Sequence, residues 1–72
     1  MYFHFTMQLD SKEKIDVESE CNNGFDPDYV SAFIGDQEVY NDLSERNQGM
    51  IMEELFKKIA ESRHTIIHER NP

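Results

Sequence analysis

Cysteine, basic residues and long apolar runs are scarce in this 72-residue sequence. Cys21 is the only cysteine, so no disulfide can form within the chain, and a reducing compartment is favoured over secretion. No apolar run approaches the roughly 18 residues that a membrane-spanning helix needs. The first residues lack the basic start and the long apolar stretch of a signal peptide. Together these absences predict a soluble, cytoplasmic protein that does not enter a membrane.

The shortage of basic residues gives the chain a strong negative charge. Fifteen Asp and Glu residues stand against seven Lys and Arg, for a net charge of −8. This sign argues against direct nucleic-acid binding and against an anionic membrane surface, because both would repel the chain. Residues 25–49 hold six acids and only one base, Arg46. The partner that electrostatics favours is therefore a protein with a basic surface.

The length bounds the architecture to a single domain, residues 1–72. A chain this short buries only about 60% of its unfolded surface. Its single core rarely supplies more than roughly 3–5 kcal/mol of net stability. Formation of a homodimer is therefore an alternative that the length leaves open.

Two segments near the N-terminus alternate between apolar and polar residues, which is typical of half-buried strands. In residues 2–9 the apolar positions are Phe3, Phe5, Met7 and Leu9. In residues 14–20, Ile15 and Val17 alternate with acids. The polar stretch 10–13 joins the two segments and predicts a β-hairpin. Acids on one face of the second strand would be about 7 Å apart.

Residues 26–34 are ambiguous between a short helix and a strand. Asp26-Pro27 and Gly35 are start and stop signals of a helix. The β-prone residues between them instead favour strands on both sides of Gly35-Asp36, continuing into 37–40, and we adopt that interpretation.

The C-terminal segment has helical periodicity. Its apolar positions are Ile51, Met52, Leu55, Phe56, Ile59 and Ala60. Asp42 with Glu45 resembles a capping box, and Gly49 suggests that the regular helix starts only near Gln48. Residues 64–68 either continue the helix or form a last strand.

These elements predict an α+β fold. A small antiparallel sheet of three to four strands, beginning with an N-terminal β-hairpin, packs against one C-terminal amphipathic helix.

Catalytic and metal sites are weakly supported. His64 and His68 lie four residues apart, but the Glu that a two-histidine zinc motif places after the first histidine is absent. The acids around Pro27 and Asp36 lack the remainder of a calcium loop. Cys21 lies near Glu18 and Glu20, which disfavour a reactive thiolate, although His4 is one strand away. We expect no enzyme activity, no metal and no cofactor.

Fixed carboxylates are the feature that departs most from an average small domain. We expect a non-enzymatic acidic module that binds a protein, one form of which is an inhibitor that occludes a basic, nucleic-acid-binding site by mimicking nucleic acid. The predicted contact residues are Asp16, Glu18, Glu20, Asp26, Asp28, Asp36 and Glu38. The alternative is a homodimeric accessory subunit whose acids serve only solubility.

Overall fold

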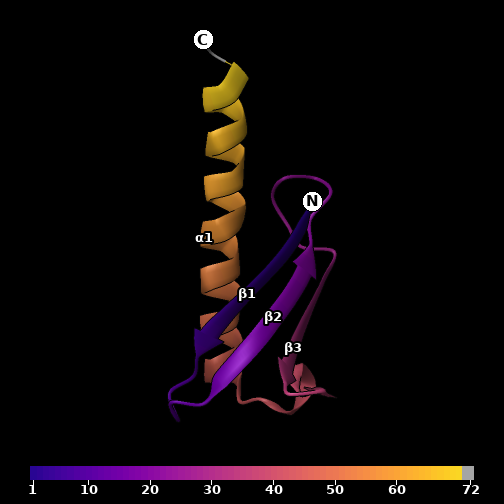
Figure 1. Cartoon of the computed structure of the whole chain (residues 1–72), viewed down its shortest axis with the longest axis vertical. Helices are drawn as coiled ribbons and strands as arrows, with labels where there is room; N and C mark the ends of the chain where they lie inside the picture. The colour runs from indigo at the N-terminus through magenta and orange to yellow at the C-terminus, as the bar shows by residue number, and fades with distance from the viewer. Residues whose placement is uncertain (71–72) are drawn as a thin grey trace.

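A computed structural model describes the backbone of residues 1–70 and the side chains of residues 1–62. The chain folds into a four-stranded antiparallel sheet followed by one long helix. Figure 1 shows that the helix lies behind the sheet and extends past its end. A helix of 26 residues is about 39 Å long, which accounts for most of the 43 Å longest dimension.

The predicted N-terminal hairpin is confirmed. Strand β1 (Tyr2–Gln8) pairs antiparallel with β2 (Lys14–Glu20). In β1 the exposed and half-buried side chains alternate, and in β2 Ile15 and Val17 are buried between half-buried acids. Lys12 has a φ of 68° in the connecting turn, a left-handed conformation that is common in short hairpin loops.

The ambiguous segment forms a strand, as expected, but only from Tyr29 onward. Strand β3 (Tyr29–Ile34) pairs with β2, and β4 (Gln37–Glu38) pairs with β3. Gly35 has a φ of 62° in the two-residue turn between them, which glycine adopts without strain. Strand β4 is shorter than predicted because the chain turns at Val39 into a 3-10 helix, η1 (Tyr40–Asp42).

The start of the long helix differs from the prediction. Helix α1 (Glu45–Arg70) begins at Glu45 rather than near Gln48, and it continues through residues 64–68. The prediction of a capping box at Asp42 was wrong, because Asp42 belongs to η1. Ser44 caps the helix instead, since its Oγ accepts a hydrogen bond of 3.2 Å from the Asn47 amide.

Replacement of Ser44 by alanine is expected to lower the free energy of unfolding by about 1 kcal/mol, because an N-cap acceptor is lost. The matched variant Asp42→Ala is expected to change it by less than about 0.5 kcal/mol. Urea unfolding followed by circular dichroism measures both values. A larger loss in Asp42→Ala than in Ser44→Ala would contradict the assigned cap.

The core lies between one face of the sheet and one stripe of α1. Ile51, Leu55 and Ile59 follow one another at four-residue spacing on the helix and are fully or almost fully buried. Ile51 belongs to a cluster with Val17 of β2, and Leu55 and Ile59 belong to a second cluster with Cys21. The sheet covers a stripe that is narrower than the predicted apolar face.

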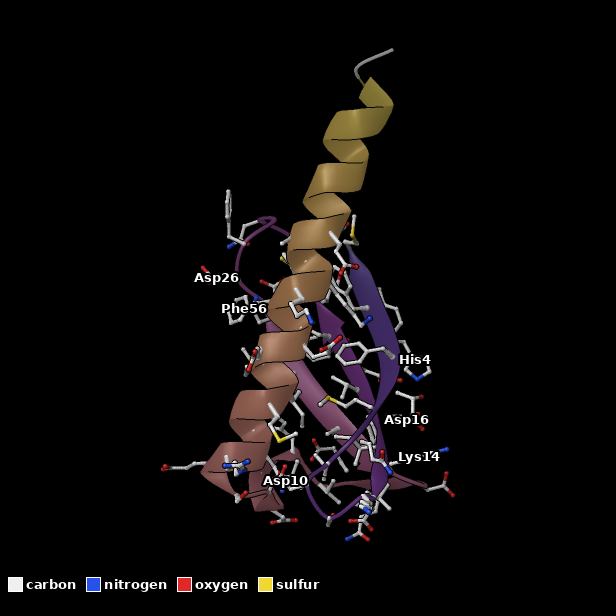
Figure 2. All side chains as sticks on the ribbon, turned by 90° about the vertical axis from the view of Figure 1, so that its left-hand side faces the viewer. His4, Asp10, Lys14, Asp16, Asp26 and Phe56 are labelled. Carbon is white, nitrogen blue, oxygen red and sulfur yellow. The ribbon has the colours of Figure 1, made fainter. Side chains whose placement is uncertain are left out.

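Two residues of the predicted helix stripe therefore lie outside the core. Phe56 is 42% exposed and Ala60 is exposed. Both lie about 100° around the helix from the buried positions that precede them, and Figure 2 shows Phe56 directed away from the sheet.

The predicted α+β architecture is confirmed: a four-stranded antiparallel sheet packs against one C-terminal helix. Within the part of the chain that the structure describes, no helix has both the length and the apolar character needed to cross a bilayer.

Candidate functional site

The face of the sheet opposite α1, here called the open face, carries three of the predicted contact residues in one row. The strand register places Asp16 beside Thr6, Glu18 beside His4, and Glu20 between Tyr2 and Tyr29. Alternation along β2 points all three carboxylates to this side, because their neighbours in sequence are buried against the helix. The row is therefore positioned by backbone pairing on both sides.

A fourth acid joins this row across a shallow hollow of about 260 Å³. The hollow is lined by His4, Asp16, Glu18, Phe33, Gly35 and Asp36. Asp36 lines the hollow from the two-residue turn between β3 and β4. Thr6 Oγ1 donates a hydrogen bond of 2.8 Å to Asp16 Oδ1, which restrains that carboxylate. Lys14 is the basic residue that β2 places on the same face, at the far end of the strand.

Tyr2 reports the electrostatic character of the open face. Desolvation against its neighbours raises the pKa of the Tyr2 hydroxyl above its ordinary value of 10.0, and the Glu18 carboxylate raises it further through hydrogen bonding and charge. Tyr29 adds to the shift. Tyr2 therefore remains a neutral hydrogen-bond donor next to the carboxylate row.

Replacement of Glu18 by glutamine is expected to lower the pKa of Tyr2 toward 10.0, because the negative charge beside the phenol is removed. The raised pKa means that the folded chain holds this proton more tightly than the unfolded chain. The resulting stabilisation is present below the unfolded pKa and is lost as the pH rises through the folded value. An NMR titration of the Tyr2 ring signals measures the shift. An unchanged pKa in Glu18→Gln would contradict the contact.

The remaining predicted contact residues are not part of the same row. Glu38 turns its carboxylate to the backbone and accepts hydrogen bonds of 3.3 Å from the amides of Ala32 and Tyr40. Asp28 accepts a hydrogen bond of 2.7 Å from Asn22 in the loop after β2. In Figure 2, Asp26 lies on the opposite side of the view from His4 and Asp16.

Aromatic side chains on the open face were not among the predicted contact residues. Tyr2 is 55% exposed and Tyr29 is 44% exposed, and they flank Glu20. Phe33 lines the hollow near Asp36. The alternation along β1 and the register with β3 were the signals that could have placed them beside the acids.

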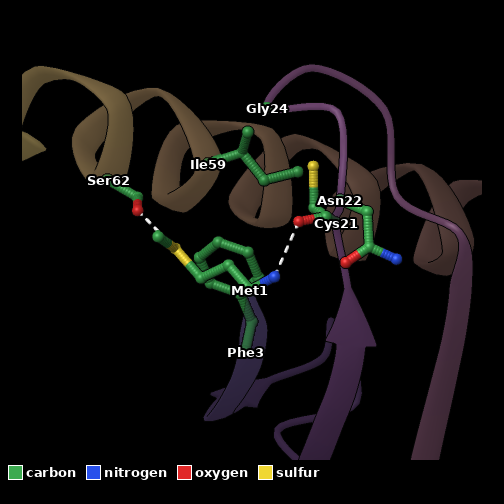
Figure 3. A pocket seen from close by; sticks show the side chains of 7 residues that line it. All are labelled: Met1, Phe3, Cys21, Asn22, Gly24, Ile59 and Ser62. Atoms are coloured by element: carbon green, nitrogen blue, oxygen red, sulfur yellow. Dashed lines mark hydrogen bonds between the residues drawn. The ribbon is translucent and has the colours of Figure 1, made fainter.

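A second hollow, of about 200 Å³, lies between the N-terminus, the loop after β2 and the helix. Its lining, drawn in Figure 3, consists of Met1, Phe3, Cys21, Asn22, Gly24, Ile59 and Ser62. Cys21 is only 4% exposed, and its carbonyl accepts a hydrogen bond of 2.9 Å from the Met1 ammonium group. His4 is on the open face, so the sheet separates it from the Cys21 thiol. His4 therefore does not activate the Cys21 thiol, which was the pairing that the sequence left open.

The side chains of His64 and His68 lie outside the residues whose side chains are described. Among the described side chains, no group of three His, Cys, Asp or Glu residues lies close enough to hold a metal ion. The open face is thus the region in which charged and aromatic side chains meet.

Comparison of the chain with protein-family models, with curated proteins and with solved structures finds no match.

Proposed function

We propose that this chain is a non-enzymatic module that binds a basic protein surface through its open face. The observation that carries the proposal is the row of Asp16, Glu18 and Glu20, joined by Asp36 across the hollow. Opposite charge attracts a basic partner and accelerates the encounter. The net charge of −8 acts in the same direction.

The carboxylates of the row are held by the sheet rather than by a flexible loop. Asp16, Glu18 and Glu20 are half-buried, and β2 is paired on both sides. Side chains on one face of a strand repeat at about 7 Å. A fixed row of negative charge has the character of a nucleic-acid backbone, which basic proteins bind through Lys and Arg. An inhibitor that occludes the nucleic-acid site of its partner is the form of this function that we favour.

The aromatic side chains beside the acidic row favour a partner that is rich in arginine. Tyr2 and Tyr29 present exposed rings on either side of the Glu20 carboxylate. A guanidinium group can pair with a carboxylate and stack on an aromatic ring at the same time. Tyrosine is also enriched at protein interfaces. These side chains would supply contact area that the acids alone do not have.

An arginine-rich peptide titrated into the ¹⁵N-labelled chain tests the proposal. We expect the largest amide shifts in residues 16–20 and 35–36, with binding that weakens steeply as salt is added, because exposed charges are screened over about 8 Å at physiological ionic strength. A neutral peptide of the same length is the control. Shifts centred on the exposed face of α1 would reject the open face as the binding surface.

The alternative is a homodimeric accessory subunit in which the acids provide only solubility. It predicts that the chain self-associates. It also predicts that the basic peptide binds weakly, and with the same affinity, to every acidic part of the surface. The same titration separates the two functions, because only the first concentrates the shifts on the open face.

A further inference from the structure

The outer edge of β1 is an unpaired strand edge. The strand order β1-β2-β3-β4 places β1 at one end of the sheet. At both ends of the hairpin, the β1 side exchanges hydrogen bonds with β2 through odd-numbered residues: Met1 pairs with Cys21, and the Leu9 amide donates to the Glu13 carbonyl at 2.9 Å. Antiparallel ladders alternate between bonded and non-bonded pairs. Tyr2, His4, Thr6 and Gln8 therefore direct their amides and carbonyls outward.

The two edges of this sheet are built differently. Strand β4 is only two residues long, and the Glu38 carboxylate there binds backbone amides. A short strand and a charge are devices that prevent edge-to-edge pairing. Strand β1 is seven residues long, and it contains no Asp, Glu, Lys, Arg or Pro. In the part of the chain that is described, no other backbone segment bonds to its outer edge.

We propose that this edge pairs antiparallel with β1 of a second copy of the chain, so that one sheet runs through both copies. The strand is complementary to itself about a two-fold axis at Phe5, because His4 then meets Thr6 of the second copy and Tyr2 meets its Gln8. Each such pair exchanges an amide and a carbonyl in both directions. The half-buried Phe3, Phe5 and Met7 gain apolar neighbours on the helix side.

The uncharged composition of β1 suits a second copy at this edge. The strand has no acidic side chain for a basic partner to pair with, and two copies of it bring no like charges face to face. The β2 rows of the two copies would be separated by three strand spacings, about 14 Å. This exceeds the screening length of about 8 Å at physiological salt. The dimer would also present two acidic rows on one continuous face.

The pairing predicts an alternating pattern of amide protection in the wild-type chain. As the protein concentration rises from low micromolar to millimolar, the mass measured by sedimentation should double. The amides of residues 4, 6 and 8 should then exchange at least tenfold more slowly, while those of residues 3, 5 and 7 are protected at all concentrations. A monomer over this range, or a dimer with fast exchange at 4, 6 and 8, would overturn the proposal.

Thr6→Pro and Thr6→Val form a matched pair for the same measurement. Both lose the hydroxyl that bonds Asp16, but only proline removes the outward amide. We expect dimerisation to weaken at least tenfold in Thr6→Pro and to persist in Thr6→Val, and equal dimerisation of the two would contradict the model. The wild-type exchange pattern decides the question even if Thr6→Pro does not fold.

Salt distinguishes this proposal from binding at the open face. Added salt screens the repulsion between the two acidic copies, so the dimer should strengthen between low and physiological ionic strength, whereas basic-peptide binding should weaken. A chain that stays monomeric and still binds the peptide would contradict only the edge pairing. A chain that dimerises but does not bind the peptide would contradict only the proposed function. Pairing of the edge with an extended segment of another protein would appear as protection at residues 4, 6 and 8 only in its presence, and would replace the second copy as the occupant.

Discussion

Reversal of Asp16 and Glu18 together to lysine is expected to weaken binding of the arginine-rich peptide by about 10- to 100-fold. An exposed ion pair contributes up to about 1 kcal/mol, and reversal replaces attraction with repulsion of similar size. Two reversals then amount to roughly 1–3 kcal/mol of binding free energy. Calorimetric titration at two salt concentrations measures the loss. The difference between wild type and variant should shrink at high salt.

The control variant must change the net charge equally at another place. Glu13 in the hairpin turn and Glu53 on α1 are both exposed. Their double reversal to lysine shifts the net charge by the same amount, so it removes any effect of total charge. We expect it to reduce peptide affinity by less than about threefold, which is at most about 0.7 kcal/mol. Equal losses in both double variants would mean that total charge, and not the open face, governs binding.

Replacement of Leu55 by alanine is expected to remove most of the stability of the fold, so that a substantial unfolded fraction is present at 25 °C. Leu55 is 0% exposed and packs with Cys21 and Ile59. Removal of a buried leucine side chain costs about 2–5 kcal/mol, through lost burial and the cavity left behind. The core of a domain of this length rarely supplies more than about 3–5 kcal/mol of net stability. Urea unfolding and the near-ultraviolet circular dichroism spectrum measure the effect.

Phe56→Ala is the matched control for the core. Phe56 is the larger side chain and is adjacent in sequence, but it is 42% exposed on the outer side of α1. We expect a clearly smaller loss than in Leu55→Ala, because Phe56 lies partly in solvent and its removal leaves no enclosed cavity. A loss in Phe56→Ala as large as in Leu55→Ala would show that the helix packs with a different phase.

Strand alternation made the sheet predictable. Apolar residues alternate with polar ones in residues 2–9 and at the start of 14–20, and only one choice of face buries them, so the faces of Phe5 and Glu18 followed from the sequence. The helix was less tightly determined, because its apolar residues cover a wider arc than the sheet can bury. Phe56 therefore matched the helical spacing and still lies outside the core.

Helix capping was mispredicted because Asp42, Ser44 and Glu45 are all chemically suitable residues within one short segment. Only the backbone decides which of them caps the helix. The turn η1 uses Asp42, and the first helical hydrogen bond runs from Gln48 to the Ser44 carbonyl at 2.9 Å. Local chemistry could not distinguish these cases without the path of the preceding turn.

The residues of the candidate site were also only partly predictable from the sequence. Asp16, Glu18 and Glu20 share a face because strands have a period of two. Asp36 lies near them only because of the tight turn at Gly35. Asp26 lies in a loop, where no periodic pattern predicts the direction of a side chain. Sequence reasoning therefore placed the strand acids and could not place the loop acids.

The most direct test of a basic partner is capture from a nuclease-treated host lysate on three immobilised proteins: the wild-type chain, Asp16→Lys with Glu18→Lys, and Glu13→Lys with Glu53→Lys. The account predicts a basic protein that the wild type and the control retain, that moderate salt releases, and that the open-face variant does not hold. Equal retention on all three proteins, or no protein retained by the wild type, would contradict the proposal that the open face is a binding surface.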